Sequence, residues 1–309
     1  MAIDTVRVQI NGVWHTLAFN AGTGKYEATV AAPNITSYNV NAGHYYPVTI
    51  EAKDLASNTT TANDTHATLG NSLRLTVKEQ TKPTIAFTAP AAGAYLTSNT
   101  PTISFQLRDE SNGSGVKIST LQIQIDTGAI LTNTSSGVTV TTVSGGYDVT
   151  YIPQSALSDG AHSVKVNVQD NDGNAANQVT RSFTVDTVAP TLNITNPASE
   201  TTYKNVSSLT VTGNTNDATS SPVTVTIKLN GTDQGTVTVD GSGNFSKAIT
   251  LASGSNSIEV KATDGAGKAT TVTRTVILDT VAPVVNSITI TPNPVNTGQS
   301  YTISVEVSD

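Results

Sequence analysis

The sequence predicts an all-β chain of tandem β-sandwich domains in an extended array. Three observations support this fold class. Val and Thr are abundant and favour a pleated, half-buried surface, whereas Gly, Asn and Asp supply turns. No stretch of ten or more residues has the apolar spacing of an amphipathic helix. The five-residue sequence Asp-Thr-Val-Ala-Pro occurs at 186–190 and again at 279–283, each time between two strand-like runs.

Proline marks the predicted domain boundaries. It cannot donate a hydrogen bond to a sheet and its φ angle is fixed, so it suits a stiff junction between two sheets. A weaker copy of the linker lies at 79–83. The linkers are spaced by roughly one small sandwich domain of ~100 residues. We therefore predict an N-terminal β-sandwich-like domain at 1–81 and domains at 82–187 and 188–280. Residues 281–309 would form a partial unit of two strands or a strand-donating tail.

Composition and charge exclude several functions. The 309-residue chain has a formal net charge of −7, which argues against a nucleic-acid partner. It contains no Cys, which excludes thiolate–metal and redox chemistry. No 18-residue apolar run exists, so we expect no membrane insertion. The first four residues lack the features of an export signal. The chain is thus used without that export route or is a shortened piece of an exported parent.

The first 81 residues begin with alternating apolar residues. Val6, Val8 and Ile10 share one face and run into Asn11-Gly12, the strongest short hairpin signal. Further strands are expected at 14–19, 26–30, 48–52 and 73–77.

The next two domains contain short strands with turns at regular intervals. In the second domain we expect strands at 84–87, 102–107, 121–125, 137–142, 147–152, 163–168 and 179–185. In the third, Val211 lies in the second strand, and the following strands are expected at 223–229, 245–249, 258–262 and 271–278. Seven or so short strands separated by turns are typical of a sandwich. Ile10-Asn11-Gly12 matches Leu229-Asn230-Gly231, which indicates repeated modules with separate cores.

The two ends of the chain look like complementary halves of one module. Residues 281–309 supply two strands, with Ile288 and Ile290 in the first and Ile303 and Val305 in the second. The first domain aligns with the third from the third strand onward. One hypothesis is that 284–309 completes another copy by strand addition, which would build a ring or a filament. The alternative is that 1–81 is complete with a different strand order, and that the tail packs on the third domain or belongs to a longer parent.

The linkers, the Leu-x-x-Gly sequences at Leu157 and Leu251, and the polar turn at 170–174 resemble those of tandem bacterial immunoglobulin-like domains. The resemblance covers 82–280 well and the two ends partially. Such domains occur in bacterial surface and adhesion proteins and in accessory virion proteins of tailed phages and prophages. The resemblance implies tandem immunoglobulin-like β-sandwiches with a structural or binding role and no enzymatic activity.

The run from Val8 to Val30, close behind Met1, resembles the prophage group more than an exported adhesin. The resemblance therefore implies a non-catalytic virion accessory component, a phage tail or capsid decoration, located in the virion. Its partners would be further copies of itself or other virion proteins, and host surface glycans. The alternative is a fragment of a secreted, calcium-stiffened adhesin at the bacterial cell surface. A third reading is a carbohydrate-binding appendage of a surface enzyme.

Acidic residues are expected to gather at one end of each sandwich, where the loops after strands two, four and six meet the preceding linker. In the second domain these are Glu79, Asp109, Glu110, Asp170 and Asp172. In the third domain they are Asp186, Asp217 and Asp264. Ca²⁺ takes six to eight oxygen ligands, so calcium is the one cofactor that the sequence suggests. The alternative is that these residues are present because Asp and Asn form turns. The 170–174 turn lacks the twelfth-position Glu of an EF-hand, which excludes that motif.

Aromatic residues in the first domain are candidates for a glycan or receptor surface. They are Trp14, Tyr38, Tyr45 and Tyr46. Flat rings stack on sugars and are enriched at binding sites. The alternative is that Trp14 belongs to the core of a small sandwich.

No pattern in the sequence predicts a catalytic site. His15, His44, His66 and His162 lack the spacing of metal ligands, and no G-x-S-x-G motif occurs. Asp109 and Glu110 could serve glycoside hydrolysis only with a cleft and flanking aromatic subsites, which the sequence does not suggest.

Overall fold

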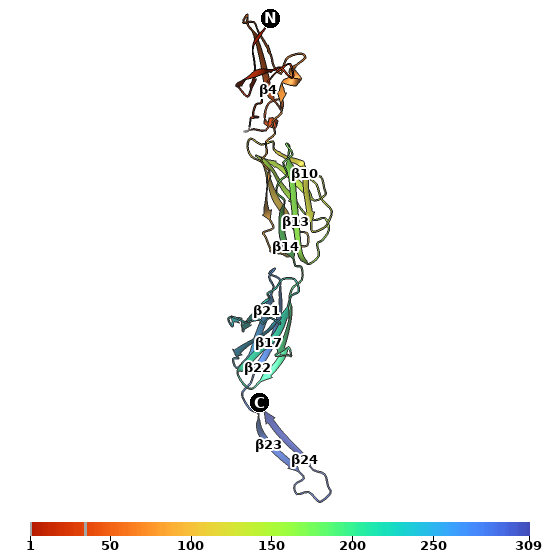
Figure 1. The fold of residues 1–309 in the computed structure, drawn as a ribbon. Coiled ribbons are helices and arrows are strands. Elements are labelled where there is room, and N and C mark those ends of the chain that lie inside the picture. The colour runs from red at the N-terminus through yellow and green to blue at the C-terminus, as the bar shows by residue number, and fades with distance from the viewer. Residues whose placement is uncertain (1, 34–35) are drawn as a thin grey trace. The chain divides into compact units, whose positions relative to one another are not determined.

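The computed structural model describes residues 2–33 and 36–309, and nearly all of its regular structure is β (Figure 1). Two short 3₁₀ helices, η1 (Tyr38–Val40) and η2 (Gly70–Leu73), are the exceptions among these residues. The all-β, tandem immunoglobulin-like prediction is confirmed. The chain forms two compact units, Met1–Val185 and Asp186–Asp309. The division between them falls two residues before the boundary predicted at 187/188.

The first 81 residues form one sheet with the strand order β3-β2-β1-β4-β5, and β6 pairs with β4. The strands are β1 (Ile3–Ile10), β2 (Val13–Asn20), β3 (Lys25–Glu27), β4 (Tyr46–Asp54), β5 (Thr59–Ala62) and β6 (Arg74–Leu75). Asn11 and Gly12, with φ angles of 48° and 80°, make the predicted turn between β1 and β2. The expected two-sheet sandwich is therefore corrected to a single sheet, because its described residues contain no counterpart of the first two strands of the later domains.

The apolar face of this sheet is only half covered. Val6, Val8 and Ile10 on β1 pair with Ala52, Ile50 and Val48 on β4. The corresponding pairs in the third domain join Val225 to Ala262, Ile227 to Val260 and Leu229 to Ile258. All six residues of the third domain are buried, whereas none of the first six is. The difference arises because no second sheet covers β1 and β4 among residues 2–33 and 36–81.

The second domain is a sandwich of two four-stranded sheets, with the orders β11-β12-β9-β7 and β10-β13-β14-β8. Its strands are β7 (Thr84–Ala89), β8 (Ala94–Leu96), β9 (Ile103–Arg108), β10 (Val116–Ile125), β11 (Val138–Val143), β12 (Gly146–Tyr151), β13 (Gly160–Asp170) and β14 (Val179–Val185). Alternation places Ile103, Phe105 and Leu107 on the inner face of β9, as predicted. Phe183 on β14 belongs to the same core, so the two sheets enclose it.

The third domain repeats the sandwich with sheets β15-β17-β20 and β16-β22-β21-β18-β19. Its strands are β15 (Thr191–Asn196), β16 (Thr201–Lys204), β17 (Ser208–Asn216), β18 (Thr224–Leu229), β19 (Thr232–Asp233), β20 (Asn244–Thr250), β21 (Gly254–Thr263) and β22 (Ala269–Leu278). Leu209 and Val211 on β17 pack in one core with Ile227, Ile258 and Val260.

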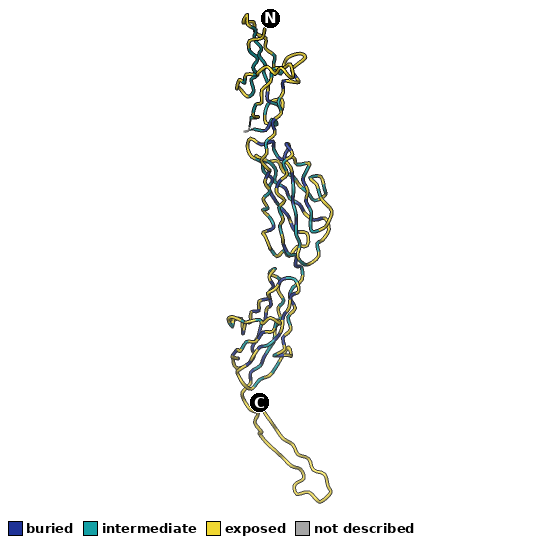
Figure 2. Tube along the Cα trace, viewed as in Figure 1, coloured by how far each residue is buried: buried dark blue, intermediate teal, exposed yellow. Residues whose placement is uncertain are grey.

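The last strands, β23 (Val284–Thr291) and β24 (Thr302–Ser308), form a hairpin that pairs with no other strand of the described chain. Every residue from Asp279 to Asp309 is exposed, and Figure 2 shows this segment in yellow throughout. Ile288 pairs with Val305 and Ile290 with Ile303, so apolar side chains are aligned without a cover.

Candidate metal centres at the domain ends

Three acidic positions recur at the same end of the second and third domains. Asp109 directly follows β9 and Asp217 directly follows β17. Arg108 pairs with Thr84 as Asn216 pairs with Thr191, so the two aspartates are structural equivalents. Asp170 and Asp264 each begin a turn. The Asp170 N–H donates to the carbonyl of Asn174, and the Asp264 N–H donates to the carbonyl of Lys268. The linker residues Glu79 and Asp186 complete the two clusters.

In the second domain, carboxylate oxygens of Glu79, Asp109 and Asp170 lie within 4.8 Å of one another. Oδ1 of Asp170 accepts hydrogen bonds from the N–H of Gly173 at 2.6 Å and of Asn174 at 2.8 Å. Oδ2 of Asp109 accepts from the N–H of Gly115 at 2.7 Å. Oδ1 of Asp109 is buried and has no hydrogen-bond partner in the described part of the chain. One oxygen is therefore left without a polar contact inside an acidic cluster.

The crowding of these carboxylates changes their acidity. Burial, followed by the hydrogen bond and charge of Asp170, raises the pKa of Glu79 to about 7. Burial and the neighbouring Glu110 raise the pKa of Asp109 to about 6, despite the opposing hydrogen bond from Gly115. Both shifts reflect the cost of holding like charges together away from water. A cation between the carboxylates would relieve the same cost.

Two of the five predicted acidic residues lie outside this cluster. Glu110 is exposed and raises the pKa of Asp109 through a side-chain hydrogen bond and, to a smaller extent, through its charge. Asp172 is buried and its carboxylate faces the first domain. It accepts hydrogen bonds from Ser37 Oγ at 2.6 Å, Asn39 Nδ2 at 2.5 Å and the Glu79 N–H at 2.9 Å. Asp172 therefore joins the first domain to the second.

In the third domain, Asp186, Asp217 and Asp264 also bring carboxylate oxygens within 4.8 Å of one another. All three residues are buried. Ser220, which is buried too, donates its Oγ hydrogen bond to Asp186 Oδ2. The sequence predicted the three aspartates, but Ser220 carried no signal beyond its place in a polar loop.

The donor set of both clusters is made of oxygen alone. Hard cations such as Ca²⁺ prefer carboxylate, carbonyl and water oxygens, and Ca²⁺ tolerates irregular geometry. The residues therefore fit calcium. No His approaches either acidic group among the residues that the structure describes.

The four predicted aromatic residues differ in exposure and do not form one shared exposed surface. Trp14 is exposed on β2, with the Arg7 guanidinium 4.4 Å from its ring centroid. Tyr45 is half-buried and donates its hydroxyl hydrogen bond to Asp64 Oδ2 at 2.7 Å. Tyr46 is buried and donates to the carbonyl of Thr36, so its ring has a structural role. Tyr38 lies half-buried in η1.

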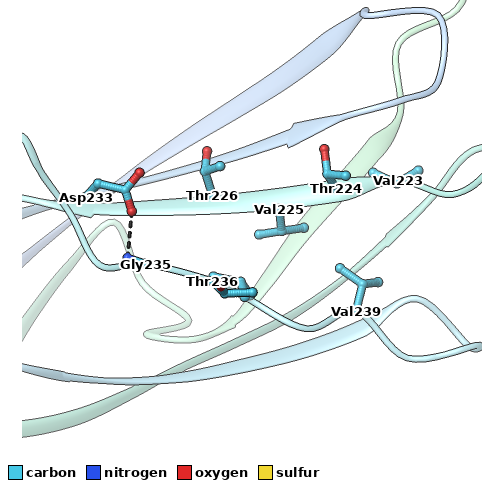
Figure 3. A pocket seen from close by; sticks show the side chains of 9 residues that line it. Val223, Thr224, Val225, Thr226, Asp233, Gly235, Thr236 and Val239 are labelled. Carbon is cyan, nitrogen blue, oxygen red and sulfur yellow. Dashed lines mark hydrogen bonds between the residues drawn. The ribbon is translucent and has the colours of Figure 1, made fainter.

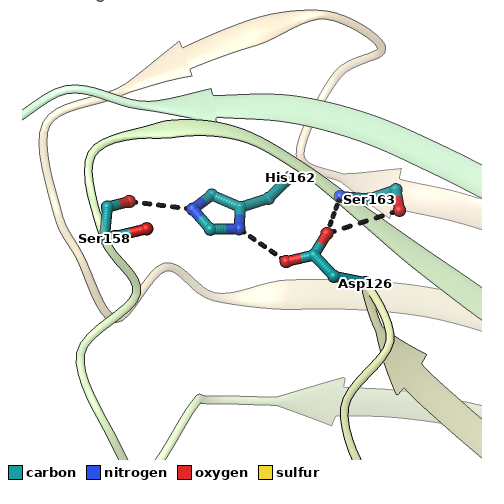
Figure 4. Close-up of polar contacts among 4 residues, drawn as sticks. All are labelled: Asp126, Ser158, His162 and Ser163. Atoms are coloured by element: carbon teal, nitrogen blue, oxygen red, sulfur yellow. Dashed lines mark hydrogen bonds and ion pairs between the residues drawn. The ribbon is translucent and has the colours of Figure 1, made fainter.

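Asp126, His162 and Ser163 form a polar group that the sequence did not predict (Figure 4). His162 Nδ1 lies 2.8 Å from Asp126 Oδ2, and His162 Nε2 lies 2.8 Å from the carbonyl oxygen of Ser158. In a hydrolytic triad the second imidazole nitrogen faces the nucleophile. Here both nitrogens face acceptors, so the protonated ring satisfies the geometry and the group has a structural role.

The third domain also has an open groove of ≈ 570 Å³ beside β18 (Figure 3). Its walls are mainly Val and Thr side chains, including Val223, Val225 and Val239. Asp233 is its one acidic lining residue, and Oδ1 of that carboxylate accepts a hydrogen bond from the Gly235 N–H at 2.6 Å. The described lining therefore has no pair of titratable groups for acid–base work.

Two family comparisons identify the kind of domain that the chain contains. Residues 95–187 match the bacterial Ig-like domain family. Residues 190–280 match the family described as glucodextranase, domain B. Each match covers one sandwich, and together with the two-sheet topology they define a protein of tandem immunoglobulin-like domains. No curated protein sequence matches the chain.

Solved structures give more distant likenesses. The fibronectin(III)-like modules of Clostridium thermocellum CbhA are 17% identical, with a TM-score of 0.38, over 63% of this chain and 94% of that one. Immunoglobulin domains 1–4 of Sidekick-1 are 13% identical, with a TM-score of 0.37, over 89% of this chain and 67% of that one. TM-scores this low support no argument about function.

Proposed function

We propose that this chain is a non-catalytic structural or adhesive protein whose joint between the first and second domains binds Ca²⁺. The observation that carries the proposal is the cluster of Glu79, Asp109 and Asp170 at the joint between the first two domains. Turn formation accounts for Oδ1 of Asp170 and Oδ2 of Asp109. It does not account for Oδ1 of Asp109, which is buried without a partner in the described chain.

Calcium at this cluster would stiffen the joint through the turn that contains Asp170 and Asp172. Asp170 contributes to the acidic cluster, whereas Asp172 holds Ser37 and Asn39 of the first domain. The linker residue Glu79 takes part in both, because its side chain lies in the cluster and its N–H donates to Asp172. A cation that fixes this turn would also fix the contact between the domains.

Cleavage of the joint by endoproteinase Lys-C tests the proposal. Lys78 lies beside the contact, and its Nζ donates to the carbonyl of Asp172 at 3.1 Å. CaCl₂ is expected to slow cleavage after Lys78 in the full chain. The Asp170→Asn variant keeps the acceptor for Gly173 and Asn174 but should lose the calcium effect.

The Asp240→Asn variant is the matched control for this experiment. Asp240 begins a turn of the same kind, with Oδ1 accepting from Ser242 and Asn244, but lies outside the acidic clusters. It should retain the calcium effect. Equal cleavage of the wild-type chain with CaCl₂ and with a chelator would contradict the proposal.

A virion accessory role, as a tail or capsid decoration, remains the more specific proposal. The family match at 95–187 supports the domain type and leaves the particle untested. A fragment of a secreted bacterial adhesin is the alternative, and a calcium-stiffened joint between the first two domains suits both. Antibodies raised against the chain should label purified phage particles from the source culture under the first proposal. Labelling of the bacterial cell surface in their place would favour the adhesin.

The match of 190–280 to glucodextranase domain B favours a second candidate function, an accessory domain of a carbohydrate-active enzyme. Trp14 is the residue to test among the four predicted aromatic residues, because it is exposed whereas Tyr38 and Tyr45 are half-buried and Tyr46 is buried. A glycan array is the direct measurement. Binding that is lost in Trp14→Ala and retained in Tyr203→Ala, an exposed aromatic control on β16, would support this candidate.

A second copy of the chain is the proposed protein partner. The half-covered face of β1 and β4 has the same pairing as the buried face of β18 and β21. In the third domain the sheet containing β15 and β17 covers that face, and β23 and β24 have the corresponding antiparallel pairing. Removal of 284–309 is expected to abolish self-association in sedimentation velocity. An unchanged sedimenting mass would exclude strand exchange.

A further inference from the structure

We propose that Asp186, Asp217 and Asp264 form a second calcium site, which binds independently of the cluster at Glu79. The exposed fractions of the three residues are 0%, 8% and 6%. Their carboxylate oxygens lie within 4.8 Å of one another. Oδ2 of Asp264 is buried and has no hydrogen-bond partner within 2–33 and 36–309. This oxygen has no partner in the described chain and is therefore available to a ligand.

Turn formation explains only part of this arrangement. Asp217 Oδ1 accepts from the N–H groups of Thr219 and Ser220, both at 2.8 Å. Asp264 Oδ1 accepts from the Lys268 N–H at 2.9 Å, and Asp186 Oδ1 from the Val188 N–H at 3.2 Å. Each aspartate thus uses Oδ1 to hold its own loop. The remaining oxygen of Asp264 takes part in no turn. Turn formation therefore does not explain why it is buried here, whereas a bound ligand would.

The charge of the cluster is not balanced by the protein. The ion pairs of the described chain join Arg7 to Glu51, Arg108 to Asp148, His162 to Asp126 and Lys228 to Glu259. None of them includes an aspartate of this cluster. An uncompensated buried charge is costly, whereas a bound cation pairs with it directly. A divalent cation therefore supplies what the surrounding side chains do not.

The chemistry of the site selects calcium over other common cations. Its side-chain donors are oxygens, without the His or Cys that zinc sites use. The three carboxylates come from a linker and two loops. This suits the flexible coordination of Ca²⁺ better than the strict octahedron of Mg²⁺. Because Glu79 and Asp109 of the first cluster are half-buried, we expect the fully buried second cluster to bind calcium more tightly.

Hydrogen exchange of the full chain, with and without CaCl₂, tests the second site by location. Protection is expected in peptides that cover 217–220 and 264–268. At a calcium concentration of 100 times Kd, exchange that requires loss of the ion should slow about 100-fold. Protection confined to 109–115 and 170–174 would overturn this inference while leaving the first cluster intact.

Two variants connect the response to its ligands. Asp264→Asn keeps an acceptor for Lys268 and should abolish the response at 217–220 and 264–268, with that at 170–174 unchanged. Asp279→Asn alters the same linker motif, where the aspartate is exposed and its Oδ1 accepts a hydrogen bond from the Val281 N–H. It should behave as wild type. Persistence of the 217–220 response in Asp264→Asn would overturn the site.

Calorimetric titration of the wild-type chain with CaCl₂ keeps the test decisive if Asp264→Asn does not fold. Calcium sites in extracellular modules have Kd values of roughly 10⁻⁴–10⁻³ M, so the titration should extend to about 10 mM. Binding together with protection at 217–220 in the wild-type chain supports the inference. Absence of that protection at about 10 mM CaCl₂ overturns the site. Equal protection by MgCl₂ at the same concentration overturns the assignment of calcium as its cation.

Discussion

His162 Nδ1 lies 2.8 Å from Asp126 Oδ2, at the turn that follows β10. The corresponding turn of the third domain contains Asn230 and Asn256, joined by a 3.2 Å hydrogen bond from Asn230 Nδ2 to Asn256 Oδ1. Asp126 and Asn230 have similar φ angles, 50° and 53°. One turn is therefore built with an ionisable pair in one domain and a neutral pair in the next.

The ionisable pair predicts a stability optimum in mild acid. Burial alone would lower the pKa of His162, but the hydrogen bonds that the imidazolium donates to the Asp126 carboxylate and the Ser158 carbonyl outweigh burial and raise the pKa. Burial alone would raise the pKa of Asp126, but His162 and the Ser163 N–H outweigh it and lower the pKa. The His162 contribution is complete below 6.5 and is lost as pH rises through its folded-state pKa. The Asp126 contribution is complete above 3.8 and is lost as pH falls through its lowered pKa.

We expect the second domain to lose up to about 1 kcal/mol of stability as pH rises from 6 to 9, since Asp126 is partly exposed. Thermal unfolding across this range measures the loss. The double variant Asp126→Asn, His162→Asn copies the pair of the third domain and should remove the His162 share of the pH dependence, leaving the loss that the raised pKa values of Glu79 and Asp109 cause. His44→Asn, in an exposed loop, should keep it. A double variant that loses as much stability between pH 6 and 9 as the wild-type chain would contradict this assignment.

The Asp172 contact predicts that one side chain controls the joint of the first two domains. Asp172→Ala leaves Ser37 and Asn39 without their acceptor and should cost about 2–3 kcal/mol, because hydrogen bonds to charged groups are strong. Hydrogen exchange at 37–41 should become faster, with the strands of the second domain unchanged. Ser119→Ala, an exposed serine of β10, is the control. Unchanged exchange at 37–41 would show that the contact does not hold the joint.

Within one turn, we expect substitution by Ala to be harmful at Gly243 and tolerated at Gly241. Gly243 has a φ of +83°, and a Cβ there would lie 2.0 Å from the Thr215 carbonyl oxygen. Gly243→Ala should therefore destabilise the third domain by about 2–3 kcal/mol or more. Gly241 has open space around its Cβ direction, so Gly241→Ala should stay within about 0.5 kcal/mol of wild type. Calorimetric unfolding of both variants gives the comparison, and equal effects would contradict it.

Substitution of the equivalent valines Val225 and Val6 measures how much a covering second sheet contributes to stability. Val225 is 4% exposed under β15, β17 and β20, whereas Val6 is half-buried. Val225→Ala should cost about 2 kcal/mol, and Val6→Ala clearly less. Local hydrogen exchange measures each domain separately. If a second copy covers β1 and β4, the cost of Val6→Ala should rise with protein concentration.

Alternation and turn chemistry made most of the fold predictable. Ile103, Phe105 and Leu107 lie in the core as their period of two requires, and Asn11-Gly12 forms the expected turn. The short strands β8 and β16 were missed, because three or four residues without alternation carry little signal.

The candidate sites were predictable as positions but not as contacts. Strand ends placed Asp109 and Asp170 near Glu79, and the structure brings their carboxylates together. Asp172 lies two residues from Asp170, and on sequence alone both appeared to be ligands. Only the structure shows that Asp172 faces Ser37, since a contact across 135 residues leaves no local pattern. The Asp126–His162 pair was hidden for the same reason.

Asp186 has a consequence for how such domains can be exchanged by recombination. It lies before the first strand of the third domain, yet its carboxylate lies with Asp217 and Asp264. A gene fragment that begins at Asp186 transfers all three acidic groups with the sandwich. A gene fragment that begins at Pro190 transfers all the strands of the sandwich but only two of the three acidic groups, Asp217 and Asp264. A duplicated domain therefore inherits the complete acidic cluster only when the break falls ahead of the linker, which makes the linker part of the heritable unit.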